Sequence, residues 1–313
     1  MATTTNITTT YAGEKAAGYV AAALLSANTI ENGGITVKPN VKFKEVLKRV
    51  STDDLLADGS CDFSATSTLT LDEKILEPET FQVNLQLCKE DFRSDWDAIE
   101  MGYSAFDELP ASFADFLIGH VAAKVAGKME QNIWSGVDGN SGEFSGFETL
   151  LAADAELPTG QQIAAAGGGV NAGNVIAELG KVVDAIPTRL YGEEGLTLYV
   201  SSNVYRAYVR SLGGFGANGL GAAGVNAQGN NQAMGDLMFD GIPLFMCNGM
   251  SDDTAICTVK DNLYFGTGLA SDSQEVKVLD MSNLDGSQNV RVIMRMTAGV
   301  QYAFAGDVVT YGI

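Results

Sequence analysis

The last fifty residues constrain the fold most, because their side chains alternate between apolar and polar with a period of two. The clearest run covers 290–297, and the alternation resumes at 300–304 after Ala298-Gly299. Shorter runs at 263–265 and 276–278 precede it. This period is typical of β-strands, and Asp285-Gly286 tolerates the positive φ of a tight hairpin turn. A C-terminus of strands without a nucleophile, a metal-ligand cluster or a phosphate loop favours a structural role over catalysis.

Two more alternating runs lie upstream, at 69–71 and 81–87, on either side of polar residues around Lys74 and Pro78. We therefore expect a long two-stranded hairpin over 63–87, with Lys74 near its tip. Because a hairpin with one apolar face is marginal in water, that face should lie on another part of the chain or on a neighbouring molecule. The apolar positions of this hairpin are Phe63, Leu69, Leu71, Phe81, Val83, Leu85 and Leu87.

The strongest helix signal begins at Pro110, a residue suited to the first helical position. Apolar residues recur from there at spacings of three and four as far as Trp134, which predicts a helix of about 25 residues and about 37 Å. The only histidine of the chain, His120, lies beside this stripe without an acidic or cysteine neighbour in sequence. We interpret it as a packed or capped helix residue rather than a base.

The remaining elements are weaker signals. Towards the N-terminus we expect a mobile Thr-rich start, a helix at 11–27, a short strand at 35–37 cut off by Pro39, and at 41–50 either a helix or a strand. An α/β unit follows the long helix, with a helix capped by Asn174, a buried strand at 196–200 and a second helix begun by Ser202-Asn203.

The segment 213–235 contains eight glycines and almost no large apolar residues. Such a loop cannot bury enough surface to order itself. A phosphate cradle is disfavoured because no strand directly precedes these glycines and no Lys-Ser/Thr follows them. The residues of this loop that we single out are Gly213, Phe215, Leu220 and Val225.

The net charge of -20, from 19 basic and 39 acidic residues, argues against general binding to nucleic-acid backbones, which needs Lys and Arg. One short basic segment, at 38–49, is an exception. It is either a contact for an acidic protein partner or for nucleic acid, or it is a solvated helix face. We expect synthesis in the cytosol and no membrane association, because no apolar run reaches the roughly 18–20 residues of a membrane span and the start lacks signal-peptide features. The basic segment contains Lys38, Lys42, Lys44, Lys48 and Arg49.

The four cysteines, Cys61, Cys88, Cys247 and Cys257, include no C-x-x-C pair. With one histidine in the chain, a zinc site is disfavoured, and we expect no metal or cofactor. Cys61 and Cys88 flank the expected hairpin, and Cys247 and Cys257 flank a turn signal, so each pair has the option of meeting across strands. Reduced, buried thiols are the interpretation that a cytosolic protein favours.

The order of these elements resembles that of the major capsid proteins of tailed bacteriophages, which have the Hong Kong 97-type fold. The resemblance covers essentially the whole chain, and its more specific parts are the stretches 87–96, 109–120 and 297–304. It implies an α+β fold with five parts. These are an N-terminal arm (1–58), an extended β-hairpin loop (59–95), a peripheral domain (96–173) with a spine helix (110–134), an axial domain (174–268) with a glycine-rich loop (213–235), and C-terminal strands (269–313) that return to the peripheral domain.

The resemblance also implies a structural role without enzymatic activity. The chain would self-assemble, through hexamers and pentamers, into an icosahedral head that encloses double-stranded DNA without reading its sequence. It would assemble in the host cytoplasm, reside in the virion and meet a portal protein, with decoration proteins as a further partner class. The short start, which has no long charged helical prefix, implies a separate scaffolding protein.

The extended loop would lie over an adjacent subunit, so its apolar residues and the basic segment at 42–49 are candidate intersubunit contacts, and 213–235 would lie at the capsomer centre. Some members of the family crosslink through a lysine of this loop, but we interpret Lys74 as a solvated turn residue. A basic segment of an acidic subunit is better placed at a subunit or scaffold contact than against DNA.

Three other functions compete with this interpretation. An encapsulin-type nanocompartment shell shares the fold and encloses an enzyme, and the residues do not exclude it. A hydrolase would use paired acids such as Asp95 and Asp97 or Glu193-Glu194, but such pairs are common on acidic surfaces and must face one another across a substrate. A surface adhesin would carry a secretion signal.

Overall fold

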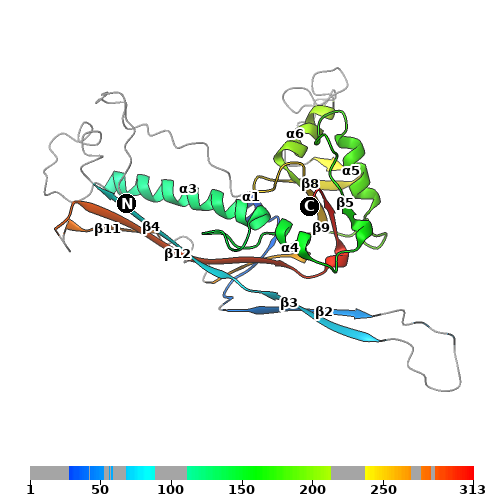
Figure 1. Ribbon diagram of the computed structural model, residues 1–313, viewed down its shortest axis with the longest axis horizontal. Coiled ribbons are helices and arrows are strands. Elements are labelled where there is room, and N and C mark those ends of the chain that lie inside the picture. Colours follow the sequence, from blue (N-terminus) through cyan, green and yellow to red (C-terminus); the bar gives the residue numbers. More distant parts are fainter. Residues whose placement is uncertain are drawn as a thin grey trace.

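The computed structural model describes residues 28–41, 43–52, 56, 58, 68–88, 111–212, 237–268, 276–282 and 286–313. The molecule is elongated (Figure 1): a long helix lies along a narrow sheet at one end, a compact α/β body lies at the other, and a two-stranded ribbon extends past the body. The described strands form three sheets.

A single long strand, β12 (Asn289–Tyr302), organises the narrow sheet. β4 pairs along one edge of it, β11 and then β10 pair along the other edge, all antiparallel, and β1 adds to β10 in parallel. The strands expected in the C-terminal part are confirmed, and the alternation on both sides of Ala298-Gly299 belongs to one strand. Gly299 is required there because a Cβ would lie 2.9 Å from the Glu77 carbonyl oxygen. The other strands of this sheet are β1 (Thr36–Lys38), β4 (Glu79–Cys88), β10 (Leu263–Thr267) and β11 (Val276–Asp280).

The long helix α3 (Ala111–Ser135) covers one face of this sheet and confirms the helix expected from Pro110. Val121 and Val125 on the helix pack against Val290 and Val292 on β12. The alternation of β12 therefore has a simple cause, since every second side chain faces the helix.

The body contains a mixed six-stranded sheet in the order β5-β13-β9-β6-β8-β7. Two helices, α5 and α6, cover one face of it, where Leu179 and Val204 pack with Leu198 and Val200. Its strands are β5 (Gln162–Ile163), β6 (Leu196–Ser201), β7 (Met238–Phe239), β8 (Ile242–Cys247), β9 (Ala255–Val259) and β13 (Val308–Tyr311). The helices are α5 (Val175–Asp184) and α6 (Ser202–Ser211), and the short helical turns are η1 (Thr159–Gln161), η2 (Lys260–Asn262) and η4 (Ala305–Asp307).

A second core joins the two sheets. The other face of the body sheet, with Tyr199, packs against Trp134 at the end of α3 and Phe147 of α4 (Phe147–Ala153). The short helix α1 (Asn28–Glu31) closes this core: the buried Thr29 hydroxyl donates to the Glu130 carboxylate and accepts from Trp134 Nε1 at 2.8 Å. The narrow sheet, the body and the described start of the chain are thus held by one continuous core.

The expected hairpin over 63–87 is wrong. Its two strands exist as β3 (Leu69–Leu76) and β4, but β3 pairs with β2 (Glu45–Thr52), whereas β4 pairs with β12. A hairpin register between neighbouring strands is a local prediction, and here both strands prefer partners far away in sequence. The structure also decides in favour of a strand at 45–52, where the pattern at 41–50 left a helix open.

Two smaller expectations change. Asn174 precedes α5, but its side chain makes no capping bond and instead donates to the Gly169 carbonyl at 2.9 Å. β13 pairs with β9 in the body sheet and β10 pairs with β12 in the narrow sheet, so the expected boundary at 268 does not separate the two sheets.

Cys88, Cys247 and Cys257 are free thiols, as the cytosolic interpretation favours. β6 lies between the strands that carry Cys247 and Cys257, so these two thiols cannot meet as neighbours across strands. Cys61, the helix expected at 11–27 and the Gly-rich loop lie outside the described residues.

Candidate assembly surface

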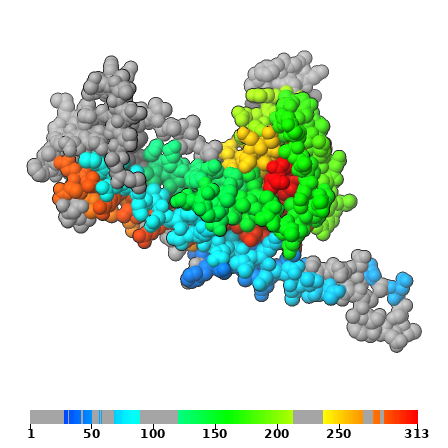
Figure 2. Space-filling model, in the orientation of Figure 1, coloured from blue at the N-terminus to red at the C-terminus, as the bar shows by residue number. Residues whose placement is uncertain are grey.

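The ribbon of β2 and β3 pairs over eight residue pairs, from Glu45 opposite Leu76 to Thr52 opposite Leu69. Neither strand pairs with a third strand in the described chain. Figure 2 shows the blue and cyan atoms of the ribbon extending away from the lower side of the body. Because side chains of a strand alternate between two faces, the ribbon presents one face to the body and the other to solvent.

The solvent side, which we call the outer ribbon face, is an apolar strip. Val46 lies opposite Ile75 and Val50 lies opposite Leu71, so these side chains share one face, with Lys48 and Glu73 between them. Exposed apolar side chains gathered on one face are typical of a protein interaction surface, and Val50 among them also borders a groove between the ribbon and the body. Its apolar members, with their exposed fractions, are Val46 (41%), Val50 (55%), Leu69 (60%), Leu71 (68%) and Ile75 (44%).

The inner face anchors the ribbon to the body. Leu47 and Leu76 are buried, and Leu76 lies so close to Gly266 of β10 that a Cβ there would meet it at 2.9 Å. Lys74 Nζ forms an ion pair with the Asp154 carboxylate and lies 4.3 Å from the ring centroid of Tyr302.

The Tyr302 hydroxyl also donates to Asp154, so one carboxylate accepts from two side chains. Burial on its own would raise the pKa of Asp154, but the hydrogen bonds from Lys74 and Tyr302 outweigh it and hold that pKa below its usual value. Burial, and then the bond to Asp154, raises the pKa of Tyr302. At neutral pH the anchor is therefore an ionised lysine–aspartate pair braced by a neutral phenol.

Arg49 forms a second anchor on the same face. Its Nε lies 3.2 Å from Asp72 on the neighbouring strand, and its Nη1 lies 3.0 Å from Glu156 of the body. These hydrogen bonds raise the pKa of Arg49 against the opposing effect of burial.

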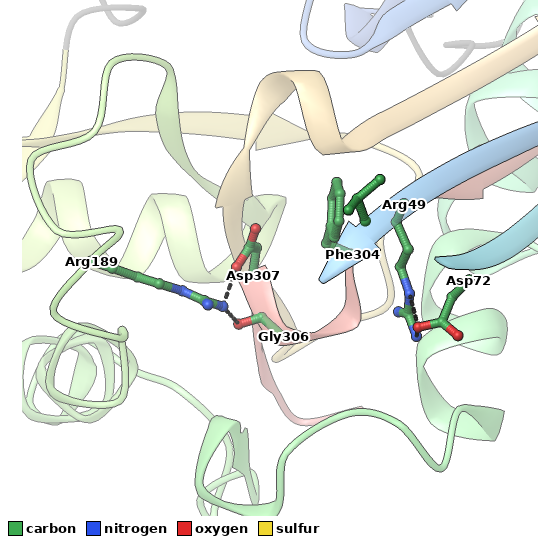
Figure 3. Close-up of a pocket in the computed structure, with 7 residues that line it drawn as sticks. Arg49, Asp72, Arg189, Phe304, Gly306 and Asp307 are labelled. Carbon is green, nitrogen blue, oxygen red and sulfur yellow. Dashed lines mark hydrogen bonds and ion pairs between the residues drawn. The ribbon is translucent and has the colours of Figure 1, made fainter. Parts of the chain in front are cut away.

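The anchor borders a groove of about 400 Å³ between the ribbon and η4, drawn in Figure 3. On its far side Arg189 Nη2 lies 3.1 Å from the Gly306 carbonyl and 2.5 Å from Asp307. The two arginines of the groove are matched by Asp72 and Asp307, so we interpret the groove as a braced junction between ribbon and body rather than as an anion-binding pocket. The residues that line it are Arg49, Val50, Asp72, Arg189, Phe304, Gly306 and Asp307.

Three of the four expected contact residues on β4 are partly buried within this chain. Val83 and Leu87 pack beneath α3, and Phe81 packs beside Phe144 with ring centroids 5.9 Å apart. Only Leu85 on that face remains substantially exposed, at 37%. The apolar face that appeared to lack cover within the chain is therefore covered by α3.

Lys74 and the basic segment also lie differently from expectation. Lys74 sits inside β3 and is paired, so its expected place at a hairpin tip is wrong. Lys44 pairs with Glu77 at 2.7 Å, and Lys48 lies opposite Glu73 on the ribbon. The basic segment thus lies in and beside a strand rather than on a helix. Phe63, Lys42, Gly213, Phe215, Leu220 and Val225 lie outside the described residues.

Leu69 and Leu71 are the expected apolar contacts that lie exposed on the ribbon, and the structure adds Val46, Val50 and Ile75 to them. The available signal for these three was the strand alternative at 41–50, since a strand there could pair with the run that the expected hairpin paired with 81–87.

In the part of the chain that the structure describes, no three His, Cys, Asp or Glu side chains gather as metal ligands. No described helix is long and apolar enough to cross a membrane. Glu193 and Glu194 are both exposed, next to each other in a loop. Asp95 and Asp97 lie outside the described residues, and the absence of a cofactor stays a prediction.

No protein-family model and no curated protein matches the chain. Solved structures match it over nearly its whole length. The capsid of a native GTA particle, computed with C5 symmetry, has a TM-score of 0.61 at 14% identity and covers 93% of this chain and 91% of its own. Mycobacterium phage Adephagia gives 0.58 at 17% identity, covering 94% and 93%. The capsid of Cyanophage P-SCSP1u gives 0.55 at 14% identity, covering 94% and 90%.

At these identities the likeness establishes the fold. The chain has the α+β, Hong Kong 97-type fold of the phage capsid structures, as its sequence resemblance implied.

Proposed function

We propose that the protein is the major capsid subunit of a tailed bacteriophage, which self-assembles into an icosahedral head enclosing double-stranded DNA. The observation that carries this proposal is the outer ribbon face, a strip of five exposed apolar side chains on a ribbon that extends past its own body. A subunit that remained alone would leave this strip in water. A subunit in a shell buries it against a neighbouring copy.

The energy of such a contact fits an assembly built from repeated weak interfaces. Full burial of a Val, Leu or Ile side chain contributes about 1.5–3 kcal/mol, and these five are roughly half exposed, so one strip offers on the order of 4–7 kcal/mol before the costs of association. That is modest for one pair of molecules. Repetition around closed rings multiplies it, because each copy then holds neighbours on both sides.

The role is structural rather than catalytic, with hexamers and pentamers as the first assemblies and the virion as the final location. A separate scaffolding protein, a portal protein and decoration proteins are the partners that this role calls for. The enclosed DNA is held without sequence-specific contacts. The solved structures reported above are phage and GTA-particle capsids, which favours a virus-type shell over a nanocompartment.

Assembly of the full chain tests this function. We expect the chain, alone or with its scaffolding protein, to give rings, tubes or closed shells by negative-stain electron microscopy and sizing. A clean monomer in every condition would refute the shell. Dense DNA in native particles supports the virus, whereas a co-purifying enzyme would support the compartment.

A paired substitution tests the ribbon contact. Val50→Asp with Leu71→Asp places two charges on the outer ribbon face, and we expect folded subunits that no longer assemble. Ile176→Asp with Val137→Asp is the matched control, since both side chains are about half exposed but lie off the ribbon. Normal assembly of the ribbon variant would remove the contact role.

A further inference from the structure

The contact between α3 and the narrow sheet is not filled along its whole length. Where the helix lies over β4 and β12 (Figure 1), a cavity of about 180 Å³ remains. Gly142, in the loop that follows α3, also lines it. The walls are chiefly apolar and come from the helix and both strands. Their apolar side chains are Phe81, Val83, Val125, Met129 and Met296.

One polar group of this cavity lacks a partner. Asn132 lines the cavity and is only 2% exposed. Its amide nitrogen donates to the Gly142 carbonyl at 2.8 Å, which fixes the orientation of the amide, whereas its Oδ1 accepts no hydrogen bond from any residue that the structure describes. A buried acceptor is costly to leave unpaired, and native structures rarely contain one without a reason. The cavity therefore offers a hydrogen-bond acceptor within an apolar site.

The size and the chemistry of the cavity together select one kind of side chain. An apolar protein cavity of about 150 Å³ accommodates a benzene molecule, so this cavity has room for one six-membered aromatic ring. A phenylalanine or leucine side chain would fill the space but leave Asn132 Oδ1 without a donor. A tyrosine side chain supplies both the ring and an O–H donor.

Two carboxylates beside the cavity add a preference for charge. Glu79 precedes Phe81 by two residues and shares its face of β4. Asp138 belongs to the loop that contains Gly142. Neither Glu79 nor Asp138 forms an ion pair with a described residue. Burial, the charge of Asp138 and that of Glu77 raise the pKa of Glu79, in that order of importance.

A cation from a ligand would relieve this repulsion. Lys128, the cation that lines the cavity, already forms an ion pair with Glu143, so it does not compensate Glu79 and Asp138. A ligand that carries lysine or arginine beside its tyrosine is therefore favoured, whereas an acidic ligand would add to the repulsion.

A second copy of this chain is a poor source of that tyrosine. Of the tyrosines that the structure describes, only Tyr191 is exposed. Its hydroxyl already donates to the Asp240 carbonyl at 3.0 Å, and Glu193 and Glu194 follow it in sequence. Docking of Tyr191 would thus bring carboxylates towards carboxylates, between copies that each carry a charge of -20. The described residues favour a different protein as the ligand.

We propose that this cavity binds a tyrosine side chain of a separate, basic protein. The phenol donates to Asn132 Oδ1, the ring fills the space between Met129 of the helix and Met296 of β12, and a neighbouring lysine or arginine faces Glu79 and Asp138. An aromatic side chain seated in a pocket is a common energetic centre of a protein interface. The inference goes beyond the proposed function and does not rest on it.

Matched peptides and methyl NMR test the site. The full chain is labelled with ¹³C-methyl methionine, so that Met129 and Met296 report from the cavity walls and Met238 and Met250 report from the body. The probe is acetyl-Lys-Tyr-Lys-amide, and its controls replace Tyr by Phe or both Lys by Glu. We expect the probe to shift the two wall methyls and leave the two body methyls unchanged.

The affinities give the sharper test. The tyrosine peptide should bind about fivefold or more tightly than the phenylalanine peptide, because only its hydroxyl pairs with the buried acceptor. The Lys-flanked peptide should bind about threefold or more tightly than the Glu-flanked peptide at low ionic strength, and added salt should narrow this difference.

Two variants locate the acceptor. Asn132→Leu removes it and should reduce the preference for tyrosine over phenylalanine to less than about twofold. Asn140→Ala is the matched control: it removes a donor to Glu143 at 3.1 Å in the same loop but keeps Asn132 Oδ1, so it should keep the preference. Where Asn132→Leu does not fold by circular dichroism, the peptide comparison on the unchanged chain decides.

Several results would overturn the proposal. These are equal binding of the tyrosine and phenylalanine peptides, no shift of either wall methyl at millimolar probe, shifts confined to the body, and an equal loss of preference in Asn140→Ala. The same wall shifts on adding unlabelled chain in place of the peptide would assign the cavity to a second copy and overturn it as well. None of these results bears on particle formation, whereas a chain that binds the peptide but never forms particles defeats the proposed function alone.

Discussion

Replacing Lys74 by methionine should release the ribbon from the body without unfolding either part. Methionine keeps an unbranched stem and a favourable sulfur contact with the Tyr302 ring, so the change removes chiefly the charge. Asp154 then keeps the Tyr302 hydroxyl as a donor but loses its counter-ion. Both members of the pair are largely buried, with 16% and 11% of their side chains exposed.

The size of the effect follows from that burial. Removing one member of a fully buried ion pair destabilises a protein by about 3–5 kcal/mol, whereas an exposed pair contributes about 0–1 kcal/mol. The retained phenol and the partial exposure place this pair between the two limits, at about 2–3 kcal/mol. This corresponds to opening of the ribbon about 30- to 150-fold more often.

Hydrogen exchange of the amides of β2 and β3 measures this opening directly, since it reports local as well as global unfolding. Lys44→Met is the matched control: its pair with Glu77 is more than half exposed on both sides, and we expect less than about fivefold faster exchange. Adding Asp154→Leu to Lys74→Met should recover part of the protection, because it removes the unpaired charge. Equal exchange in the two lysine variants would refute the reasoning.

Two further predictions concern protonation and the closure of the junction core. Because the pKa of Asp154 is lowered in the folded chain, its ionised form stabilises the docked ribbon at every pH above the unfolded pKa of about 3.9, and this stabilisation is lost as the pH falls through the still lower folded pKa. Hydrogen-exchange protection of the ribbon, corrected for intrinsic exchange, should therefore stay constant from pH 7 to 5 and fall below pH 4. The Asp154→Asn variant should lack this fall. Thr29→Val keeps the shape of a buried residue but removes the acceptor of the Trp134 indole N–H and a donor to Glu130. The free energy of unfolding, measured in urea by tryptophan fluorescence, should therefore fall by about 2–4 kcal/mol. Thr29→Ser retains the hydroxyl and should lose less than half of that, and an equal loss in both variants would contradict the role of the hydrogen bonds.

Local patterns predicted those elements whose signal lies within a few residues. The 25-residue helix α3 follows from apolar residues at spacings of three and four. The strands of the narrow sheet follow from their period of two, and Gly286 adopts the positive φ of 72° that the Asp285-Gly286 turn implied. The fold class came from the resemblance to phage capsid proteins, since no protein-family model matches the chain.

Pairing between distant strands was beyond reach of those patterns. β3 and β4 are separated by only two residues, Glu77 and Pro78, which is the signature of a hairpin, yet β3 pairs with β2 and β4 with β12. The alternation of each strand is the same whichever partner it takes. The choice depends on total burial, because β4 gains cover from α3 beside β12, whereas beside β3 it would leave Val83 and Leu87 in water.

The sequence by itself determined the long helix and the alternating strands, the acidic character of the chain and its likeness to a shell-forming fold, because periodicity, charge and motif are properties of neighbouring residues. The tertiary structure alone decided which apolar face remains open to another molecule. That face is on β2 and β3 rather than on β4, since a side chain becomes core or contact only when distant segments have taken their places around it. The same holds for Lys74, whose sequence neighbours indicated a solvated turn and whose spatial neighbours, Asp154 and Tyr302, make it the anchor of the ribbon.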